Sequence, residues 1–317
     1  MTTKDKVLRL LEENESGYIS GEEMAEKLSV SRASIWKAVK ALTDEGYIIE
    51  GVTKKGYRLV SADILSHETL SPLIPVPVYY YPEIDSTNNE AKRLVAEGVK
   101  PPFAVIAEMQ TGGRGRRGRT FVSDKGGTYF TLCIGTSDGL DIESTTTRSC
   151  LGIADAISSL GFSPQIKWVN DVYLNGKKCV GILTEGIISL EENRVSEVLI
   201  GIGVNFMTKS FPEELKDICT SLYPDSNPPV TRAEFLSREI RNVLSVLSEK
   251  DYIKRYRELC FVIGKDIDVI KLDEKRRGHC IDVDERAHLV VTFPDGHTEH
   301  ISSGEVSVRP VENHRDI

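Results

Sequence analysis

The chain has 317 residues, 40% hydrophobic and 28% charged, an ordinary composition for a globular protein of two or three domains. Its formal net charge of −8 excludes a protein whose whole surface attracts nucleic acid, so any DNA contact must come from a local basic patch. The six cysteines form no C-x-x-C pair, which argues against a zinc site and a disulfide framework. No run of about 18 apolar residues marks a membrane span, and we expect a cytoplasmic protein with reduced thiols and no membrane contact.

Residues 1–63 are predicted to form a helix-turn-helix followed by a β-hairpin, or wing. Ser20 begins one helix, because a serine followed three residues later by Glu23 is typical of a capping box. After a tight break, Ser31 can cap a further helix, which would end at Gly46. Two short helices separated by three or four residues are typical of a helix-turn-helix.

The wing would consist of residues 47–51 and 56–60. From residue 27 to residue 58 the chain has seven Lys/Arg and three acids, a balance of +4 within an acidic protein. A winged helix whose second helix reads the major groove explains this better than a small helical domain with ordinary surface lysines. The residues expected to face DNA are Ser31, Arg32, Ser34, Trp36, Lys37, Lys40, Lys54 and Lys55.

Residues 64–262 are predicted to form the domain that carries the candidate active site. Thr87 and Glu90 match a second capping box, so a helix is expected to begin here. Ser86, Thr87 and Asn88 then lie at a helix N-terminus, where N–H groups and short polar side chains can hold a polar ligand. Capping alone would also explain these residues.

Residues 111–119, TGGRGRRGR, contain four arginines and four glycines and are called the arginine loop below. Glycines can take positive φ and turn N–H groups inward to form an anion nest, while arginines supply planar cationic forks for phosphate or carboxylate. The loop also matches G-x-G-x-x-G, but that dinucleotide fingerprint needs a helix that starts inside it, and a β-like run follows here. The same residues could instead form a solvated surface turn or a patch that binds nucleic acid.

Residues 165–185 are predicted to form two strands joined by Asn175-Gly176, a strong type I′ hairpin signal. Lys178 would stand on a strand just past this turn. A further strand, 198–205, contains glycines that allow close backbone approach to a ligand. The polar residues 167–171 could be an ordinary strand end, but three polar clusters beside strands favour a binding site.

Together these motifs resemble the biotin protein ligases, specifically the bifunctional type that also represses biotin synthesis. The resemblance covers essentially the whole chain. Two departures are Val169, where the family usually has proline, and Gly112, where alanine is commoner, and neither removes a charged or hydrogen-bonding group. The matching residues are Asp85-Ser86-Thr87-Asn88, Gln110, Gly113 to Arg119, Lys167-Trp168-x-Asn170-Asp171, Lys178 with residues 179–183, and Gly201-Ile202-Gly203-Val204-Asn205.

The resemblance implies that biotin's carboxylate attacks the α-phosphate of ATP, giving biotinyl-5′-adenylate and pyrophosphate, and that an acceptor lysine then takes the biotinyl group. Such a reaction needs fixed cations and N–H donors, because two anions meet. The catalytic candidates are Arg114, Arg116 and Lys178. The implied biotin ligands are Ser86, Thr87, Asn88, Gln110, Arg114, Gly115, Arg116 and Lys178. The implied nucleotide ligands are Arg117, Trp168, Asn170 and Asn205.

Biotin, ATP and Mg²⁺ are the implied cofactors, and no residue is assigned as a metal ligand, although Asp171 is polar and nearby. The implied partners are a biotin-accepting carboxylase domain such as the acetyl-CoA carboxylase carrier protein, operator DNA, and a second copy of the chain once the adenylate is bound. The arginine loop is expected to be mobile when empty and ordered by its anionic ligand.

The implied fold class is α+β, in three domains. Residues 1–63 would be a winged helix-turn-helix, and residues 64–262 a central mixed sheet with helices, the class II synthetase-like biotin/lipoate ligase fold. Residues 263–317 contain four short alternating runs and would be a small SH3-like β-barrel. This last domain could be purely structural, or it could help to bind ATP and the acceptor, in which case Arg309 is a candidate.

Two other functions stay open. A non-catalytic biotin-sensing DNA-binding repressor would need the winged helix and a biotin site, but it would have little use for phosphate-binding arginines and Lys178. A lipoate ligase would share the catalytic fold, and the arginine loop and the winged helix argue against it.

Overall fold

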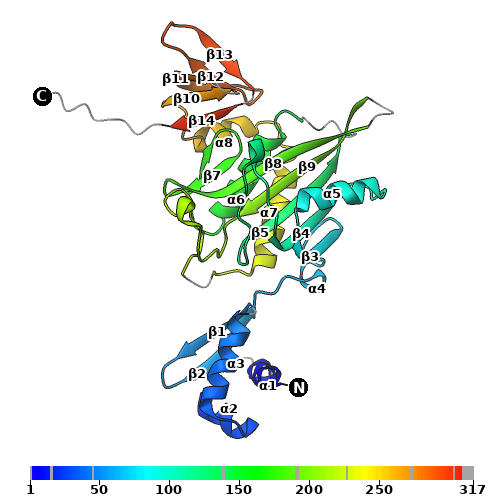
Figure 1. The fold of residues 1–317 in the computed structure, drawn as a ribbon, viewed down its shortest axis with the longest axis vertical. Helices are drawn as coiled ribbons and strands as arrows, with labels where there is room; N and C mark the ends of the chain where they lie inside the picture. The colour runs from blue at the N-terminus through cyan, green and yellow to red at the C-terminus, as the bar shows by residue number, and fades with distance from the viewer. Residues whose placement is uncertain are drawn as a thin grey trace, which may run out of the picture. The chain divides into compact units, whose positions relative to one another are not determined.

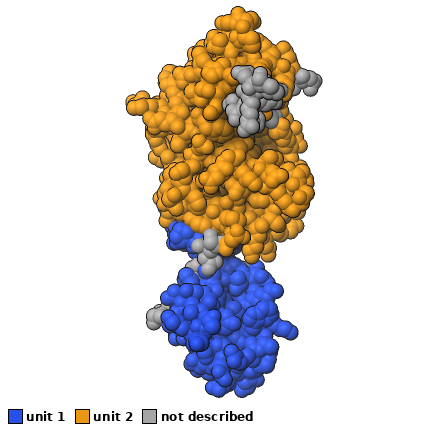
Figure 2. All heavy atoms as spheres, turned by 90° about the vertical axis from the view of Figure 1, so that its left-hand side faces the viewer, with its two compact units in different colours: residues 1–73, 227–235 blue, residues 74–226, 236–317 orange. Residues whose placement is uncertain are grey.

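A computed structural model of the chain divides into two compact units, shown in Figure 2. The N-terminal unit consists of residues 1–73 and 227–235, and the larger unit consists of residues 74–226 and 236–317. The structure describes residues 2–14, 17–44, 46–136, 140, 142–189, 193–225, 228–271, 274–302 and 304–308.

The N-terminal unit is a three-helix domain with a wing, and its second and third helices and its wing lie where the sequence predicts (Figure 1). Its elements are α1 (Thr3–Glu13), α2 (Gly21–Leu28), α3 (Arg32–Asp44), β1 (Tyr47–Val52), β2 (Gly56–Ala62) and the short α4 (His67–Leu70). The three longer helices share one apolar core, to which α1 contributes Val7 and Leu11, and α3 contributes Ile35 and Leu42. The short helix α4 was not predicted.

The predicted caps of α2 and α3 are present. Ser20 Oγ accepts a hydrogen bond from the backbone N–H of Glu23 at 3.0 Å, and Ser31 Oγ accepts one from Ser34 at 3.1 Å. The capping box predicted at Ser20 is only half formed, because the Glu23 side chain pairs with Lys27 at 2.9 Å, an i,i+4 ion pair on the helix surface, instead of returning to the Ser20 backbone. A left-handed residue, Ser29 (φ 54°), ends α2 and turns the chain into α3.

The wing is tied to the helices by a third, very short strand contact. Ile19 and Tyr57 exchange backbone hydrogen bonds of 2.9 Å in both directions. Gly56 allows this contact, because its φ is +112° and a Cβ there would clash with the Ile19 carbonyl. At the end of the wing, Asp63 is buried and receives the backbone N–H and the Nε of Arg232, each at 2.6 Å.

The larger unit is built on a seven-stranded mixed sheet in the order β3-β4-β5-β9-β8-β7-β6 (Figure 1). Only the pair β3 and β4 is parallel, and the other neighbours are antiparallel. The strands are β3 (Val78–Ile84), β4 (Phe103–Gln110), β5 (Thr128–Gly135), β6 (Gln165–Lys167), β7 (Asp171–Leu174), β8 (Lys177–Ser189) and β9 (Arg194–Val204).

Helices cover both faces of this sheet. Successive side chains of a strand point to opposite faces. Thr131 on β5 binds Asn88 of helix α5 (Thr87–Ala96), whereas Thr128 on the same strand binds Glu239 of helix α7 (Arg232–Leu247). The remaining long helices are α6 (Thr145–Ser158) and α8 (Tyr252–Leu259), which contact each other, and a short 3₁₀ turn spans Glu213–Leu215.

The C-terminal strands form a separate five-stranded antiparallel sheet in the order β13-β12-β11-β10-β14. The bounds are β10 (Asp266–Lys271), β11 (Glu274–Val283), β12 (Leu289–Thr292), β13 (Thr298–Ile301) and β14 (Glu305–Val308). The predicted α+β class is therefore confirmed. The hairpin between β7 and β8 also has the predicted turn, since Asn175 and Gly176 have φ of 51° and 77°.

Candidate active site

Three glycines on neighbouring strands form a flat strip on the face of the sheet that α5 covers. Gly181 of β8 pairs with Gly203 of β9, and Gly201 lies two residues before it. A Cβ on Gly201 would clash with the Asn88 carboxamide, and a Cβ on Gly203 would come within 2.5 Å of the Phe121 ring. The glycine strip therefore lets Asn88 and Phe121 lie directly against the strands.

The first turn of α5 lies over this strip and carries the predicted polar cluster. Ser86, Thr87 and Asn88 are all buried. Gln110, at the end of β4, accepts hydrogen bonds through Oε1 from the backbone N–H of Thr87 at 2.9 Å and from its hydroxyl at 3.1 Å. Thr131 donates to the Asn88 carboxamide oxygen at 2.6 Å, so the cluster is bonded from two strands.

The capping box predicted at Thr87 and Glu90 is wrong. The N-cap is Ser86, which makes no side-chain cap bond, and Thr87 is the first helical residue. The Thr87 hydroxyl is bonded to Gln110, and Glu90 is bonded instead by the Tyr81 hydroxyl at 2.7 Å. Tertiary partners have thus replaced the local capping pattern.

The polar cluster surrounds a small hollow of about 30 Å³. Ser86, Thr87, Asn88, Gln110 and Arg114 are among its lining residues, together with the three glycines. A space of this size holds one or two water molecules, so a larger ligand needs the surrounding side chains to move. Five of the predicted biotin ligands therefore meet here, and one of them, Arg114, is also a catalytic candidate.

The arginine loop folds back on itself without an α-helix. A single 3₁₀ turn spans Arg116–Gly118, and the loop closes by a hydrogen bond from Gly115 N to Arg119 O at 2.7 Å. The dinucleotide fingerprint is thereby excluded, because no α-helix begins inside the loop. Positive φ occurs at Gly118 (73°) and at Arg117 (56°), a non-glycine residue. Gly113 lets the loop backbone pass close to Phe121, since a Cβ at this position would clash with the Phe121 carbonyl.

The cations of the site are held by neighbouring polar groups. Arg116 donates from Nη1 to Asn170 Oδ1 at 3.3 Å. Lys178, on β8 just past the hairpin turn as predicted, forms an ion pair of 2.6 Å with Asp171 on β7. Arg117 donates from Nη2 to the backbone carbonyl of Ile270 at 3.0 Å, which connects the loop to β10 of the C-terminal sheet.

A larger hollow of about 380 Å³ opens beside this loop. Among the described residues that line it, six are cationic and a single one, Asp171, is a carboxylate. Guanidinium and ammonium groups at this density suit a polyphosphate or carboxylate ligand. The cationic lining residues are Arg114, Arg116, Arg117, Arg119, Lys167 and Lys178.

The other predicted nucleotide ligands line the same hollow. Trp168 is buried, and its Nε1 donates to the Ala287 carbonyl at 2.9 Å; its peptide bond to Val169 is cis. Asn170 donates to Ile182 O at 3.0 Å, and Asn205 donates to Thr220 O at 3.1 Å. Arg309 lies outside the described residues.

Sequence reasoning missed several residues of the site. Phe121 covers the glycine strip, and Phe211, Leu215 and Ile218 supply an apolar wall of the larger hollow. Glu185 on β8 binds Asn88 and Arg114. The signal for Glu185 was present, because it lies four residues after Gly181 on an alternating strand and faces the same side.

In the N-terminal unit, the predicted DNA-contacting residues occupy the exposed face of α3 and the wing. Arg32, Lys37 and Lys40 are exposed, and so is Trp36, with 56% of its surface accessible. Lys40 Nζ lies 5.6 Å from the Trp36 ring centroid. Lys54 and Lys55 are exposed at the wing tip, while Ser31 and Ser34 bond to each other at the start of α3.

Comparison with known proteins gives matches over both units. Residues 80–205 match the Biotin/lipoate A/B protein ligase family, and residues 3–58 match an HTH domain. The chain is 34% identical over 245 residues to the bifunctional ligase/repressor BirA of Bacillus spizizenii, covering 73% of this chain and 74% of that protein. It is 29% identical over 318 residues to the bifunctional ligase/repressor BirA of Escherichia coli, covering 97% of each.

A solved structure similar to this one is the biotin protein ligase from Aquifex aeolicus in complex with biotin and ATP. The TM-score is 0.63 at 26% sequence identity, over 74% of this chain and 98% of that chain. Within the described part of the chain, no helix is both long enough and apolar enough to cross a membrane.

Proposed function

Because the chain belongs to the biotin protein ligase family of bifunctional ligase/repressors, we propose that it activates biotin with ATP and transfers the biotinyl group to a protein lysine. The family that the sequence motifs indicated is thus confirmed. The observation that carries the activity is the larger hollow, whose described lining residues include six cations and one carboxylate, directly beside the buried polar cluster of α5.

In the first step, a carboxylate oxygen of biotin attacks the α-phosphorus of ATP, and the bond to the pyrophosphate leaving group breaks. Negative charge then builds on the phosphate, so cations fixed before the reaction are worth more than cations that must reorient. We assign this role to Arg114, Arg116 and Lys178. Their bonds to Asn89, Asn170 and Asp171 support the assignment, because each side chain is already oriented.

In the second step, the neutral amine of an acceptor lysine attacks the acyl carbon, AMP leaves with the electron pair of the broken bond, and the amine proton passes to solvent. We propose that Ser86, Thr87, Asn88, Gln110, Gly115 and the three cations hold the biotinyl group. The nucleotide is assigned to Arg117, Trp168, Asn170 and Asn205. Trp168 and Arg117 donate to carbonyls of the C-terminal segment, which supports a role of that segment, residues 263–317, in forming the nucleotide site.

The described residues of this site can bind Mg²⁺ only if phosphate oxygens of the substrate supply further ligands. Among the described residues, no group of three or more His, Cys, Asp or Glu could hold a metal ion. Mg²⁺ often binds through one or two carboxylates together with substrate phosphates. We propose Asp171, the one carboxylate among the described residues of the lining, as the protein ligand, and the ion would neutralise phosphate charge there.

For the N-terminal unit we propose that α3 enters the major groove of operator DNA and that Lys54 and Lys55 of the wing contact phosphates. We further propose that adenylate-bound subunits dimerise to bind the two halves of the operator, and that the acceptor is a biotin-accepting carboxylase domain. The six cysteines are free thiols, which supports placing the protein in a reducing compartment, the cytoplasm. Sedimentation velocity with biotin and ATP should show a dimer, and an unchanged coefficient would contradict this step.

The activity is tested by pyrophosphate release from biotin and ATP, with and without an acceptor domain. Release should depend on biotin and fall at least tenfold in Arg116→Ala. Arg241→Ala, an exposed arginine on α7 that does not line the hollow, is the matched control and should retain full release. A folded, biotin-binding wild type that releases no pyrophosphate would leave a non-catalytic biotin sensor, and faster release with lipoate would indicate a lipoate ligase.

A further inference from the structure

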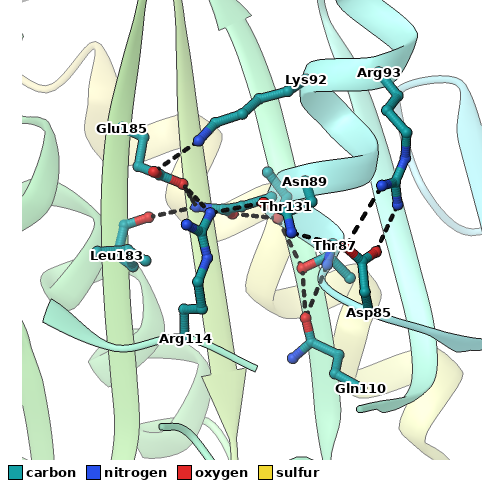
Figure 3. A network of polar contacts seen from close by, with 11 residues as sticks. Asp85, Thr87, Asn89, Lys92, Arg93, Gln110, Arg114, Thr131, Leu183 and Glu185 are labelled. Atoms are coloured by element: carbon teal, nitrogen blue, oxygen red, sulfur yellow. Dashed lines mark hydrogen bonds and ion pairs between the residues drawn. The ribbon is translucent and has the colours of Figure 1, made fainter. Parts of the chain in front are cut away.

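A half-buried carboxylate, Glu185, lies where α5, β8 and the arginine loop meet (Figure 3). Its side chain is 24% exposed. Oε1 pairs with Lys92 Nζ at 2.8 Å, and Oε2 accepts from Asn88 Nδ2 at 2.7 Å and from Arg114 Nη2 at 3.2 Å. One carboxylate thus joins three side chains, two of which line the small hollow.

Arg114 is held at one end of its guanidinium. Nη2 donates to Asn89 Oδ1 at 2.8 Å as well as to Glu185. Within the described part of the chain, both side-chain hydrogen bonds of Arg114 come from Nη2. Nε and Nη1 therefore keep their donors for a ligand, and Arg114 lines both the small hollow and the larger one.

Asn88 is fixed from several directions. Its Nδ2 donates to Glu185 and to the Leu183 carbonyl at 3.3 Å, while its Oδ1 accepts from Thr131. The side chain rests against Gly201 of the strip. Without Glu185, the amide would lose its shorter and charge-assisted acceptor and could turn on the strip.

The charge of Glu185 is available at neutral pH. Burial by itself would raise the pKa of this carboxyl, but hydrogen bonds from Lys92 and Asn88 and the nearby positive charges outweigh burial and leave the pKa below its usual value. An ionised acceptor makes shorter and stronger bonds to an amide and a guanidinium than a neutral one does.

We propose that Glu185 is a positioning residue for biotin, which orients Arg114 and Asn88 toward the ligand from behind the site. The proposal rests on the proposed function, because biotin is the ligand of that function. Residues that bind a ligand act best when their own rotamers are locked by a supporting shell. Glu185 supplies that support to one residue of the loop and one residue of α5 at the same time.

The test is steady-state pyrophosphate release by the full chain, with biotin and ATP varied separately. Glu185→Gln preserves size and one acceptor oxygen but removes the charge. We expect the KM for biotin to rise about tenfold and the KM for ATP to be unchanged. The kcat should stay within about twofold, because the 2.8 Å bond to Asn89 still holds Arg114 for the chemical step. Glu185→Asp retains the charge on a shorter side chain and should raise the KM for biotin about threefold.

A double-mutant cycle separates positioning from simple stabilisation. Arg114→Ala should itself raise the KM for biotin. In the double variant with Glu185→Gln, the total rise should be smaller than the product of the two single-variant factors, because both substitutions remove the same interaction. Glu249→Gln is the matched control: this carboxylate is 29% exposed and bonded to Arg255 at 2.7 Å, away from both hollows. It should leave the KM for biotin unchanged.

Several results would overturn the proposal. They are a KM for biotin within twofold of wild type in folded Glu185→Gln, a fully multiplicative double variant, or an equal rise in Glu249→Gln. If Glu185→Gln does not fold, an unchanged KM for biotin in Glu185→Asp overturns it instead. If the wild type binds biotin but releases no pyrophosphate, the proposed activity is contradicted. The role of Glu185 can then still be tested by measuring the biotin affinity of the same variants by calorimetry.

Discussion

The chain has two cationic surfaces, and they hold their charges differently. On α3, Lys37 is exposed, and Lys40 is partnered by the ring of Trp36 at 5.6 Å. In the larger hollow, Lys178 pairs with Asp171 at 2.6 Å, and Arg116 is bonded to Asn170. One surface presents solvated cations on long flexible stems, and the other presents cations whose positions are set by neighbouring residues.

This difference matches the two kinds of anion that the surfaces are proposed to meet. A DNA backbone offers many equivalent phosphates, so flexible lysines gain most of their affinity from counterion release. A transition state at one phosphorus requires charge at one place, and reorienting a cation during the reaction would cost free energy. Substitutions on the first surface should therefore change DNA affinity and its dependence on salt concentration. Substitutions on the second surface should lower the rate of the reaction.

The largest effect is expected at the second surface. Lys178→Ala removes a fixed cation and should lower biotin-dependent pyrophosphate release by about 100-fold or more. Lys177→Ala is the matched control, because the neighbouring side chain donates to the Lys216 carbonyl and does not line the hollow. Binding to a random-sequence DNA duplex in the absence of biotin and ATP should be unchanged in both variants, and a loss of less than tenfold in Lys178→Ala would contradict a catalytic role.

At the first surface, Lys37→Ala combined with Lys40→Ala should weaken binding to a random-sequence DNA duplex by roughly tenfold or more near 0.1 M salt. The magnitude of the slope of log affinity against log salt should fall by about two, since each phosphate contact contributes about 0.9. Lys27→Ala removes a lysine that pairs with Glu23 on α2 and should change the slope little. Pyrophosphate release should stay at the wild-type rate, and an unchanged slope would contradict the assignment of this face.

Arg117 tests whether the loop depends on the C-terminal sheet. Arg117→Ala removes both a cation and the bond to the Ile270 carbonyl, and we expect the KM for ATP to rise about tenfold, which is roughly 1.4 kcal/mol. Arg117→Lys retains the charge but loses the planar fork. If Lys restores the KM for ATP, charge alone matters; if it does not, the bond to β10 positions the loop.

Local chemistry made much of this fold predictable from sequence. The caps at Ser20 and Ser31 and the turn at Asn175-Gly176 depend on residues close in the chain, and all three are present. The cap at Thr87 was wrong because the Thr87 hydroxyl binds Gln110, 23 residues away. A local pattern cannot show which distant partner will compete for the same hydroxyl.

In the site, too, local sequence patterns were predictable and contacts between distant segments were not. Residues with a strong local signature, such as the arginine loop and Lys178, lie where the sequence indicated. Phe121 carries no motif. The alternation of β8 shows which face Glu185 lies on, but its partners are set only when β8, α5 and the loop come together. The left-handed conformation of Arg117 was equally hidden, because glycines were the residues expected to take positive φ.

The smallest expected effect concerns Glu239, a buried carboxyl on the opposite face of the sheet from the site. Burial raises the pKa of Glu239 well above its ordinary value, and the hydrogen bond from Thr128 only partly opposes the rise. The folded protein therefore retains a proton that the unfolded chain loses above about pH 4.5, so this residue's contribution to stability falls as pH rises.

Glu239→Gln removes this titration while preserving the shape of the side chain. We compare the free energies of unfolding of the variant and the wild type, measured by urea denaturation at pH 5 and at pH 6. The variant's value minus the wild-type value should be about 1 kcal/mol larger at pH 6 than at pH 5. Pyrophosphate release at neutral pH should not change, because Glu239 touches neither hollow. A stability difference that is independent of pH would mean that Glu239 is ionised in the folded protein, and its charge would then have to be accommodated on the face opposite the cationic site.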